Sequence, residues 1–233
     1  QLHRDGSASN SEMNYMIWDE EKQIQILQEM FIGPSAQHSS TAFDMIQEVL
    51  QEGFDYRRDT TKKLERNFKA DQPNRKWATD VTEFNVSGSK LYLSPIIDLY
   101  NGEIISYDLS ERPVFAQVVN MLKKGLRKIK NTENLIIHSD QGWQYQMKQY
   151  QYLLQKKGIV QSMSRKGNCL DNAIIENFFG TLKSELFYIK KFRTIEELKN
   201  EIKQYIDYYN NDRIKSNLNK MSPIKYRAHY YQN

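Results

Sequence analysis

Several features are scarce in this 233-residue chain, and each scarcity excludes a class of protein. The chain has a single cysteine, Cys169, which rules out an internal disulfide and any cysteine-rich zinc module. Its apolar runs are only a few residues long, so none is expected to span a membrane. Its first residues do not pair a positive stretch with an apolar one, so we expect no secretion signal. We therefore expect a cytoplasmic protein with no membrane partner.

The net charge of +4 hides two oppositely charged regions. Residues 1–55 carry two basic and ten acidic side chains, a net charge of −8, whereas residues 56–233 carry 31 basic and 19 acidic side chains, a net charge of +12. A basic body is typical of proteins that bind a polyanion such as nucleic acid. Ordinary solubility explains the same charge equally well, so a nucleic-acid partner needs support from motifs.

The spacing of apolar residues divides the chain into three regions. Residues 1–55 form an acidic segment with helical periodicity and no recognisable binding motif. Residues 56–72 are charged and patternless, and we interpret them as a linker. Residues 73–230 carry the strand and helix patterns of a folded domain with a helical C-terminal extension.

Strand patterns open this domain and then alternate with helix patterns. Three strands are expected at 77–86, 90–100 and 103–110, with the turn pair Asn-Gly between the last two. Hairpins followed by strand–helix alternation predict an α/β fold: a mixed five-stranded sheet, with three antiparallel strands and then parallel ones, flanked by helices. The remaining strands are expected over 134–140 and 159–164, and the helices over 113–129, 144–158, 171–189 and 194–211.

Two aspartates occupy informative positions on the predicted strands. Asp140 ends an apolar strand, at the tip where parallel sheets bind ligands, although a plain turn aspartate would look the same. Asp80 lies inside the first predicted strand, where aspartate is disfavoured. By strand alternation it shares a face with Ala78 and Phe84, which argues against a solvent-facing acid.

A glutamate, Glu176, lies on the helix expected over 171–189. Together with Asn172, Gly180 and Lys183 it forms a polar stripe, which in most helices is simply a solvated face. Glycine within a helix costs about 1 kcal/mol relative to alanine. Gly180 therefore indicates that something approaches the backbone closely at this stripe.

Three converging carboxylates would repel one another unless a cation lay between them. Oxygen ligands in this number suit Mg²⁺ or Mn²⁺. Two such ions about 3.5–4 Å apart form a clamp for displacement at phosphorus. The 35 residues between Asp140 and Glu176 are weak support alone, because the chain holds 29 acids and chance pairs at one separation are common.

Five sequence blocks, taken in order, resemble one protein family. They are "WATDVTEF", "YLSPIIDLYNGEIISYDLS", "HSDQGWQY", "SMSRKGNCLDNAIIENFFGTLKSE" and "YIDYYNNDRIKSNLNKMSPIKY". They are similar to bacterial insertion-sequence transposases of the DDE type, whose catalytic core resembles retroviral integrase. The resemblance covers about residues 57–228 and includes the 35-residue spacing.

This resemblance implies a ribonuclease-H-like fold in which Asp80, Asp140 and Glu176 form a catalytic acidic triad that binds two Mg²⁺ or Mn²⁺ ions. The implied activity is metal-dependent cleavage of DNA ends and strand transfer, which integrates a mobile element. The implied partners are the element's terminal repeats, target DNA and further copies of the chain, at the bacterial nucleoid. DNA phosphates are expected at Lys183, Arg165, Lys166 and Asn172, although a solvated basic surface is the alternative for the cations.

The chain departs from the family at its front, where related transposases carry helix-turn-helix segments. Two interpretations stay open: a truncated or rearranged copy, or a core that takes its DNA-binding function from a separate polypeptide. A nuclease on the same fold and a catalytically silent DNA-binding remnant are the competing functions. The lysine past the glutamate and the C-terminal "YYNNDR" block favour the transposase, and the three intact acids oppose the remnant.

Three residues near Asp140 have alternative roles. His138 lies two residues earlier on the strand, and we expect it to make a hydrogen bond rather than to bind metal. Trp143 and Tyr145 could stack on bases or pack a loop, and packing is the favoured expectation.

Overall fold

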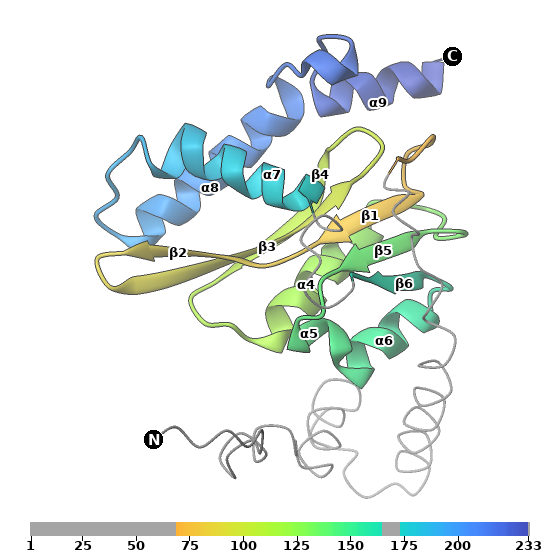
Figure 1. The fold of residues 1–233 in the computed structure, drawn as a ribbon, viewed down its shortest axis with the longest axis horizontal. Helices are drawn as coiled ribbons and strands as arrows, with labels where there is room; N and C mark the ends of the chain where they lie inside the picture. Colours follow the sequence, from red (N-terminus) through yellow and green to blue (C-terminus); the bar gives the residue numbers. More distant parts are fainter. Residues whose placement is uncertain (1–68, 165–172, 233) are drawn as a thin grey trace, which may run out of the picture. The chain divides into compact units, whose positions relative to one another are not determined.

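The structure is a computed structural model that describes residues 69–164 and 173–232 (Figure 1). The chain divides into two units, residues 1–55 and 56–233, and the described residues belong to the second. The predicted N-terminal segment, most of the predicted linker and Cys169 lie outside the described residues. Within the described part, no helix is long and apolar enough to cross a membrane.

The described strands form one mixed sheet, which confirms the predicted fold class. Strand β3 pairs antiparallel with β1, β2 and β4, whereas β1, β5 and β6 run parallel to one another. The order across the sheet is β2-β3-β1-β5-β6, with β4 on the other side of β3. The strands are β1 (Lys76–Thr79), β2 (Thr82–Val86), β3 (Ser89–Asp98), β4 (Ile104–Ser110), β5 (Ile136–Ser139) and β6 (Val160–Met163).

The sheet has six strands rather than the predicted five because the first predicted strand is interrupted. Strand β1 ends at Thr79 and β2 begins at Thr82, so Asp80 lies in the break and not within a strand. The Asp80 carboxylate accepts a hydrogen bond from the Val81 amide at 2.7 Å, which ties the side chain to its own backbone at that point. This local bond is typical of aspartate outside regular structure.

Helices cover both faces of the sheet. Figure 1 shows α4, α5 and α6 on one side and α7 and α8 on the other. The helix predicted over 144–158 is divided at Met147, whose backbone is extended, and α9 was not predicted. The helices are α4 (Phe115–Leu126), α5 (Trp143–Gln146), α6 (Lys148–Gln155), α7 (Ala173–Leu182), the π-turn η2 (Lys183–Phe187), α8 (Ile195–Asn211), the short η3 (Ser216–Leu218) and α9 (Pro223–Gln232).

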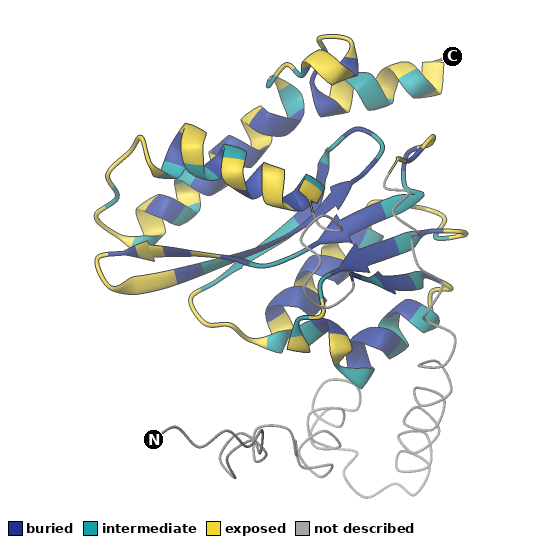
Figure 2. Ribbon diagram, viewed as in Figure 1, coloured by how far each residue is buried: buried dark blue, intermediate teal, exposed yellow. Residues whose placement is uncertain are grey.

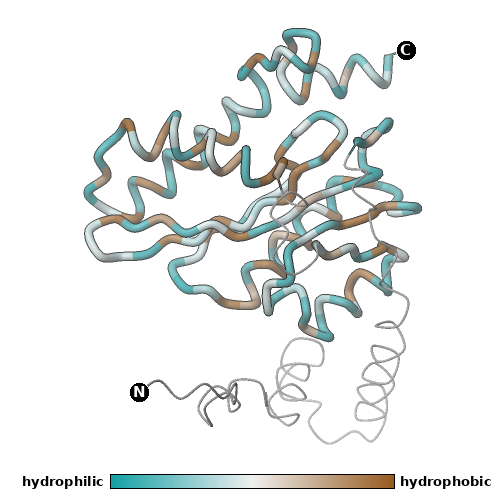
Figure 3. The backbone as a smooth tube through the Cα atoms, in the orientation of Figure 1, coloured by the Kyte–Doolittle hydropathy of each residue, from teal (hydrophilic) through white to brown (hydrophobic). Residues whose placement is uncertain are grey.

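Two hydrophobic clusters fill the spaces on either face. Neighbouring residues of β1 go to different clusters: Ala78 joins the one beneath α7 and α8, and Trp77 the one beneath α4 and α6. Phe84 lies in the same cluster as Ala78, as alternation predicts. Figure 2 shows that the central strands are buried, and Figure 3 shows that apolar residues concentrate along them. Because both faces of the sheet are covered, side chains that could meet a ligand are expected at the ends of its strands.

Candidate active site

Two of the predicted acids follow the ends of adjacent parallel strands. Strand β1 pairs with β5 in a constant register, with Trp77 beside Ile137 and Ala78 beside His138. Continued by two residues, that register sets Asp80 beside Asp140, and neighbouring strands lie about 4.8 Å apart. The sheet therefore delivers two half-buried carboxylates to one edge.

The third predicted acid, Glu176, comes from helix α7. Ile175 and Phe178 on this helix are buried in the cluster that contains Ala78 of β1. That packing fixes the helix against the strand, and Glu176 stays exposed in its first turn. Its charge is close enough to Asp80 to act on the pKa of that carboxyl.

The electrostatics of Asp80 show that the three acids share one environment. Burial raises the pKa of Asp80 to about 7, the Val81 amide opposes this, and the charges of Asp140 and Glu176 raise it further. Both of these charges therefore act in the same direction as burial. Negative charges held together in this way favour a protonated carboxyl or a bound cation.

The donor set is chemically suited to a hard divalent cation. No group of three or more histidine, cysteine, aspartate and glutamate side chains within residues 69–164 and 173–232 is arranged to hold an ion as it stands. Carboxylates that share a site repel one another unless a cation or a proton offsets their charge. Carboxylate oxygens are the ligands that Mg²⁺ and Mn²⁺ prefer, so the residues present suit such an ion.

Side chains around Asp140 hold its strand end in place. Its carboxylate accepts a hydrogen bond from the Gly142 amide at 2.9 Å. His138 is buried and its Nδ1 lies 2.9 Å from the Ser162 hydroxyl, which confirms the hydrogen-bonding role predicted for it. The Tyr145 hydroxyl lies 3.3 Å from that of Thr79, at the end of β1.

The two aromatic residues that follow Asp140 differ in exposure. Tyr145 is fully buried and its ring packs edge-on against Tyr150, so packing is confirmed for it. Trp143 is 49% exposed, which is not the packing expected for it. An exposed indole three residues after Asp140 is available to a ligand at this edge.

The predicted DNA contacts are only partly described. Lys183 begins the π-turn directly after α7, so the two-turn spacing from Glu176 is intact, and its ammonium lies 5.4 Å from the centre of the Phe84 ring. A β-carbon added at Gly180 would meet no described atom within 4 Å, so the close approach predicted there is not made by the described part of the chain. Three predicted contacts lie outside the described residues: Arg165, Lys166 and Asn172.

Comparisons with known proteins identify the family of the chain. Two family profiles, both described as integrase core domain, match residues 70–169 and 176–230. The chain is 59% identical over 168 residues to the putative transposase InsK of insertion sequence IS150 from Escherichia coli, which covers 72% of this chain and 59% of that protein. It is 54% identical over 165 residues to a transposase-like protein of Haemophilus influenzae, covering 71% of this chain and 76% of that one.

Solved structures of retroviral integrases share the fold. One is the intasome of simian T-cell lymphotropic virus in complex with the PP2A regulatory subunit B56 gamma, with a TM-score of 0.59 at 16% identity over 68% of this chain and 56% of that one. Another is the catalytic core domain of HTLV-2 integrase in complex with magnesium, with a TM-score of 0.53 at 17% identity over 67% of this chain and 97% of that one. The chain thus belongs to the insertion-sequence transposases that carry an integrase core domain.

Proposed function

We propose that the chain is the catalytic core of a DNA transposase, a polynucleotidyl transferase with Asp80, Asp140 and Glu176 as its acidic triad. The observation that carries this proposal is the β1–β5 register, which sets two of the acids side by side within the electrostatic reach of the third. The aligned region spans 59% of the InsK protein, so transposase activity is proposed for this chain and is not assigned to it by the alignment.

The proposed reaction has two displacements at phosphorus. In the first, a water oxygen attacks a phosphodiester at the element's end, and the broken bond frees a 3′ hydroxyl. In the second, that hydroxyl attacks a phosphodiester of target DNA, and the target's own 3′ oxygen leaves. The number of phosphodiester bonds is unchanged by the second step, so joining needs no energy source.

The residues of the chain would position these reactants. The three carboxylates would hold two divalent ions, Mg²⁺ or Mn²⁺, which when bound activate the attacking oxygen and stabilise the leaving one. The Gly142 amide fixes one oxygen of Asp140, so that its other oxygen can face the ions. The open space over Gly180, between Glu176 and Lys183, lets a DNA backbone lie directly on α7.

Self-association on DNA is also part of the proposal, because the two ends of an element must be cut and joined together. Light scattering of the chain with and without terminal-repeat DNA would measure it. A complex with one chain per DNA end and no larger species would contradict it. A separate polypeptide would supply recognition of the repeat sequence, because residues 1–55 carry a net charge of −8 and no recognisable binding motif.

A strand-joining assay tests the central proposal. The substrate is DNA with the terminal repeats of the element that encodes the chain, incubated with target plasmid and Mg²⁺. Glu176→Gln keeps the size of the side chain but removes its charge, and we expect joined products to disappear. Glu196→Gln, an exposed glutamate on α8, is the matched control and should keep wild-type joining.

The assay separates the alternatives. Wild-type joining by Glu176→Gln would refute the triad. Products that are cut but never joined would indicate the nuclease. Calorimetric titration with Mg²⁺ adds an independent measurement, since absence of binding would support the silent remnant.

A further inference from the structure

A second candidate site lies on the other flank of helix α7, away from the sheet edge that carries the aspartates. It is a cavity of about 610 Å³ between α7, the end of β3, the end of α8 and the loop that follows α8. Asn177, which directly follows Glu176, and Thr181 face it from α7. Among the described residues that line it, Arg213 and Lys215 are the charged ones, and none is an acid.

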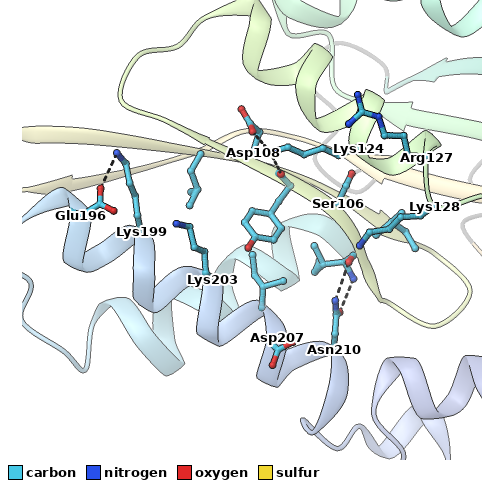
Figure 4. A pocket seen from close by; sticks show the side chains of 15 residues that line it. Ser106, Asp108, Lys124, Arg127, Lys128, Glu196, Lys199, Lys203, Asp207 and Asn210 are labelled. Atoms are coloured by element: carbon cyan, nitrogen blue, oxygen red, sulfur yellow. Dashed lines mark hydrogen bonds and ion pairs between the residues drawn. The ribbon is translucent and has the colours of Figure 1, made fainter.

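A larger groove elsewhere gives the contrast. It occupies about 840 Å³ along the edge of β4, between α4 and α8 (Figure 4). Acids line this groove together with its cations, and two of the lysines form ion pairs, Lys124 with Asp108 and Lys199 with Glu196. The groove therefore neutralises much of its own charge, whereas the cavity beside α7 does not.

The two cations of the cavity differ in their partners. Arg213 is held by Glu185, whose oxygens lie 2.9 and 3.1 Å from its Nε. Lys215 donates to the Tyr209 hydroxyl at 2.6 Å and lies 4.3 Å above the centre of that ring. No ion pair links Lys215 to an acid among the described residues, so its positive charge is not neutralised there.

The Lys215 ammonium packs close to the turn between β3 and β4. A β-carbon at Gly102 in that turn would come within 2.7 Å of it, although the flexible lysine could shift, and the φ of +70° is what favours glycine there. Burial, and then the charge of Arg213, lower the pKa of Lys215 to about 8. Partial burial of a cation costs folding free energy, a cost that proteins accept at binding sites.

Exposed neutral donors complete the cavity. Asn177 lies on α7, and Ser216 and Asn217 lie on the loop, all three exposed. A cation among amide and hydroxyl groups, with no acid among the described lining residues, suits recognition of a phosphate. Asn177 and Glu176 lie on the same helix, so a DNA strand that crosses α7 from the acids would reach this opening.

We propose that this cavity, with Lys215 as its cation, holds a backbone phosphate of the DNA substrate on the flank of α7 opposite the acidic triad. The identity of the ligand as DNA rests on the proposed function. The two proposals can be tested separately, because phosphate binding at Lys215 is measured without metal and without any reaction.

The experiment measures binding of the full chain to a labelled duplex of mixed sequence by fluorescence anisotropy, in EDTA, over a series of salt concentrations. Each phosphate contact contributes about 0.9 to the slope of log affinity against log salt. Lys215→Met should reduce that slope by about one contact, and Lys215→Arg should restore it. Lys156→Met, at an exposed lysine directly after α6, is the matched control and should keep the slope.

A second pair of variants covers the case in which Lys215→Met folds poorly. Asn217→Asp places a negative charge in the cavity lining, whereas Asn219→Asp makes the same change two residues further on, outside the lining. Both positions are exposed, so both variants should fold. We expect several-fold weaker binding of the duplex for Asn217→Asp alone.

Thermal melting distinguishes a binding lysine from a structural one. If Lys215 serves a ligand, Lys215→Met should melt at the wild-type temperature or above it. A wild-type slope for Lys215→Met, or equal affinities for Asn217→Asp and Asn219→Asp, would overturn the proposal. So would stabilisation of the wild type, but not of Lys215→Met, by inorganic phosphate with unchanged duplex binding, since the cavity would then serve a free phosphate. Loss of joining by Glu176→Gln would be unaffected by any of these results.

Discussion

The two ends of strand β1 each place an acid beside the sheet, and the two acids have opposite surroundings. Asp98 pairs with Trp77 near the start of the strand and is completely buried. Arg227 of α9 lies 2.6 Å from its carboxylate, and the amides of Asn74 and Tyr100 donate to it at 2.8 and 3.0 Å. Asp80 follows the other end of the strand and is only half-buried.

The charges around these acids explain the difference. Burial raises the pKa of Asp98, but Arg227 and the two amides oppose that rise. At Asp80 the charges of Asp140 and Glu176 both add to the effect of burial. A buried acid paired with a cation typically stabilises a fold, whereas an acid whose pKa is raised by neighbouring acids is a candidate for a functional site. This comparison yields predictions in which each acid or its partner is changed and the effects on joining and on stability are compared.

The largest expected effect is on joining by Asp80→Asn. The variant keeps the shape of the side chain and removes the charge that would hold a cation. Joining should fall roughly thousandfold, the equivalent of about 4 kcal/mol of metal-derived stabilisation. The strand-joining assay measures it, with Asp98→Asn compared at a temperature where both variants are folded. Comparable losses for the two would show that the acids do not differ in role.

The next effect is on stability, at the other end of the strand. Arg227→Met would leave the buried Asp98 and the neighbouring Glu103 without the guanidinium that lies 2.6 Å from each. Breaking a buried pair in this way costs about 3–5 kcal/mol of unfolding free energy. Urea denaturation measures the loss, and Asp80→Asn should show no such loss. An Arg227→Met variant as stable as the wild type would mean that the ion pair does not hold α9.

The sequence pattern indicates Asp80 as a candidate site residue, but it does not indicate the ion pair near the other end of β1. Asp80, Asp140 and Glu176 stand out because acids on apolar elements violate a local pattern. The Asp98–Arg227 pair has no such signal, because its members are separated by 129 positions and each looks like an ordinary charged residue. Only the folded chain shows that they meet.

Local physics explains the errors in the predicted elements. The pattern around Asp80 reads as one continuous strand, and the break depends on a hydrogen bond between its carboxylate and the next amide. Helix α9 has little apolar periodicity, since Pro223 is its one buried residue, so a pattern search misses it. The proposed role of Lys215 has no sequence signal either, because it depends on which described residues line the cavity around it, and no spacing reveals those.

A smaller effect concerns pH. The pKa of Asp80 is 3.8 in the unfolded chain and about 7 in the folded one. Between these values the folded chain binds more protons than the unfolded one, so the metal-free protein should lose stability as pH rises from about 4 to about 7. Asp80→Asn should lose less over that range. Melting temperatures in EDTA measure both, and parallel curves would contradict the shift.

Addition of Mg²⁺ at pH 7.5 should stabilise the wild type more than Asp80→Asn. A cation that binds the folded chain alone stabilises it in proportion to the logarithm of its concentration. The wild type should therefore melt at a higher temperature with Mg²⁺, and Asp80→Asn should respond much less. An equal response would place the bound ion away from Asp80.

The smallest predicted effect sharpens the comparison at its functional end, where Trp143 is the exposed aromatic residue nearest in sequence to Asp140. Stacking of one base on an aromatic ring contributes about 1–3 kcal/mol, so Trp143→Ala should weaken binding of single-stranded DNA about tenfold. Tyr231→Ala on α9 removes a ring that is 65% exposed and is the matched control. Because neither ring is buried, both variants should keep the wild-type melting temperature, and anisotropy measures their affinities. Equal affinities for the two variants would mean that the indole does not contact DNA, and that this edge of the sheet acts through its charges alone.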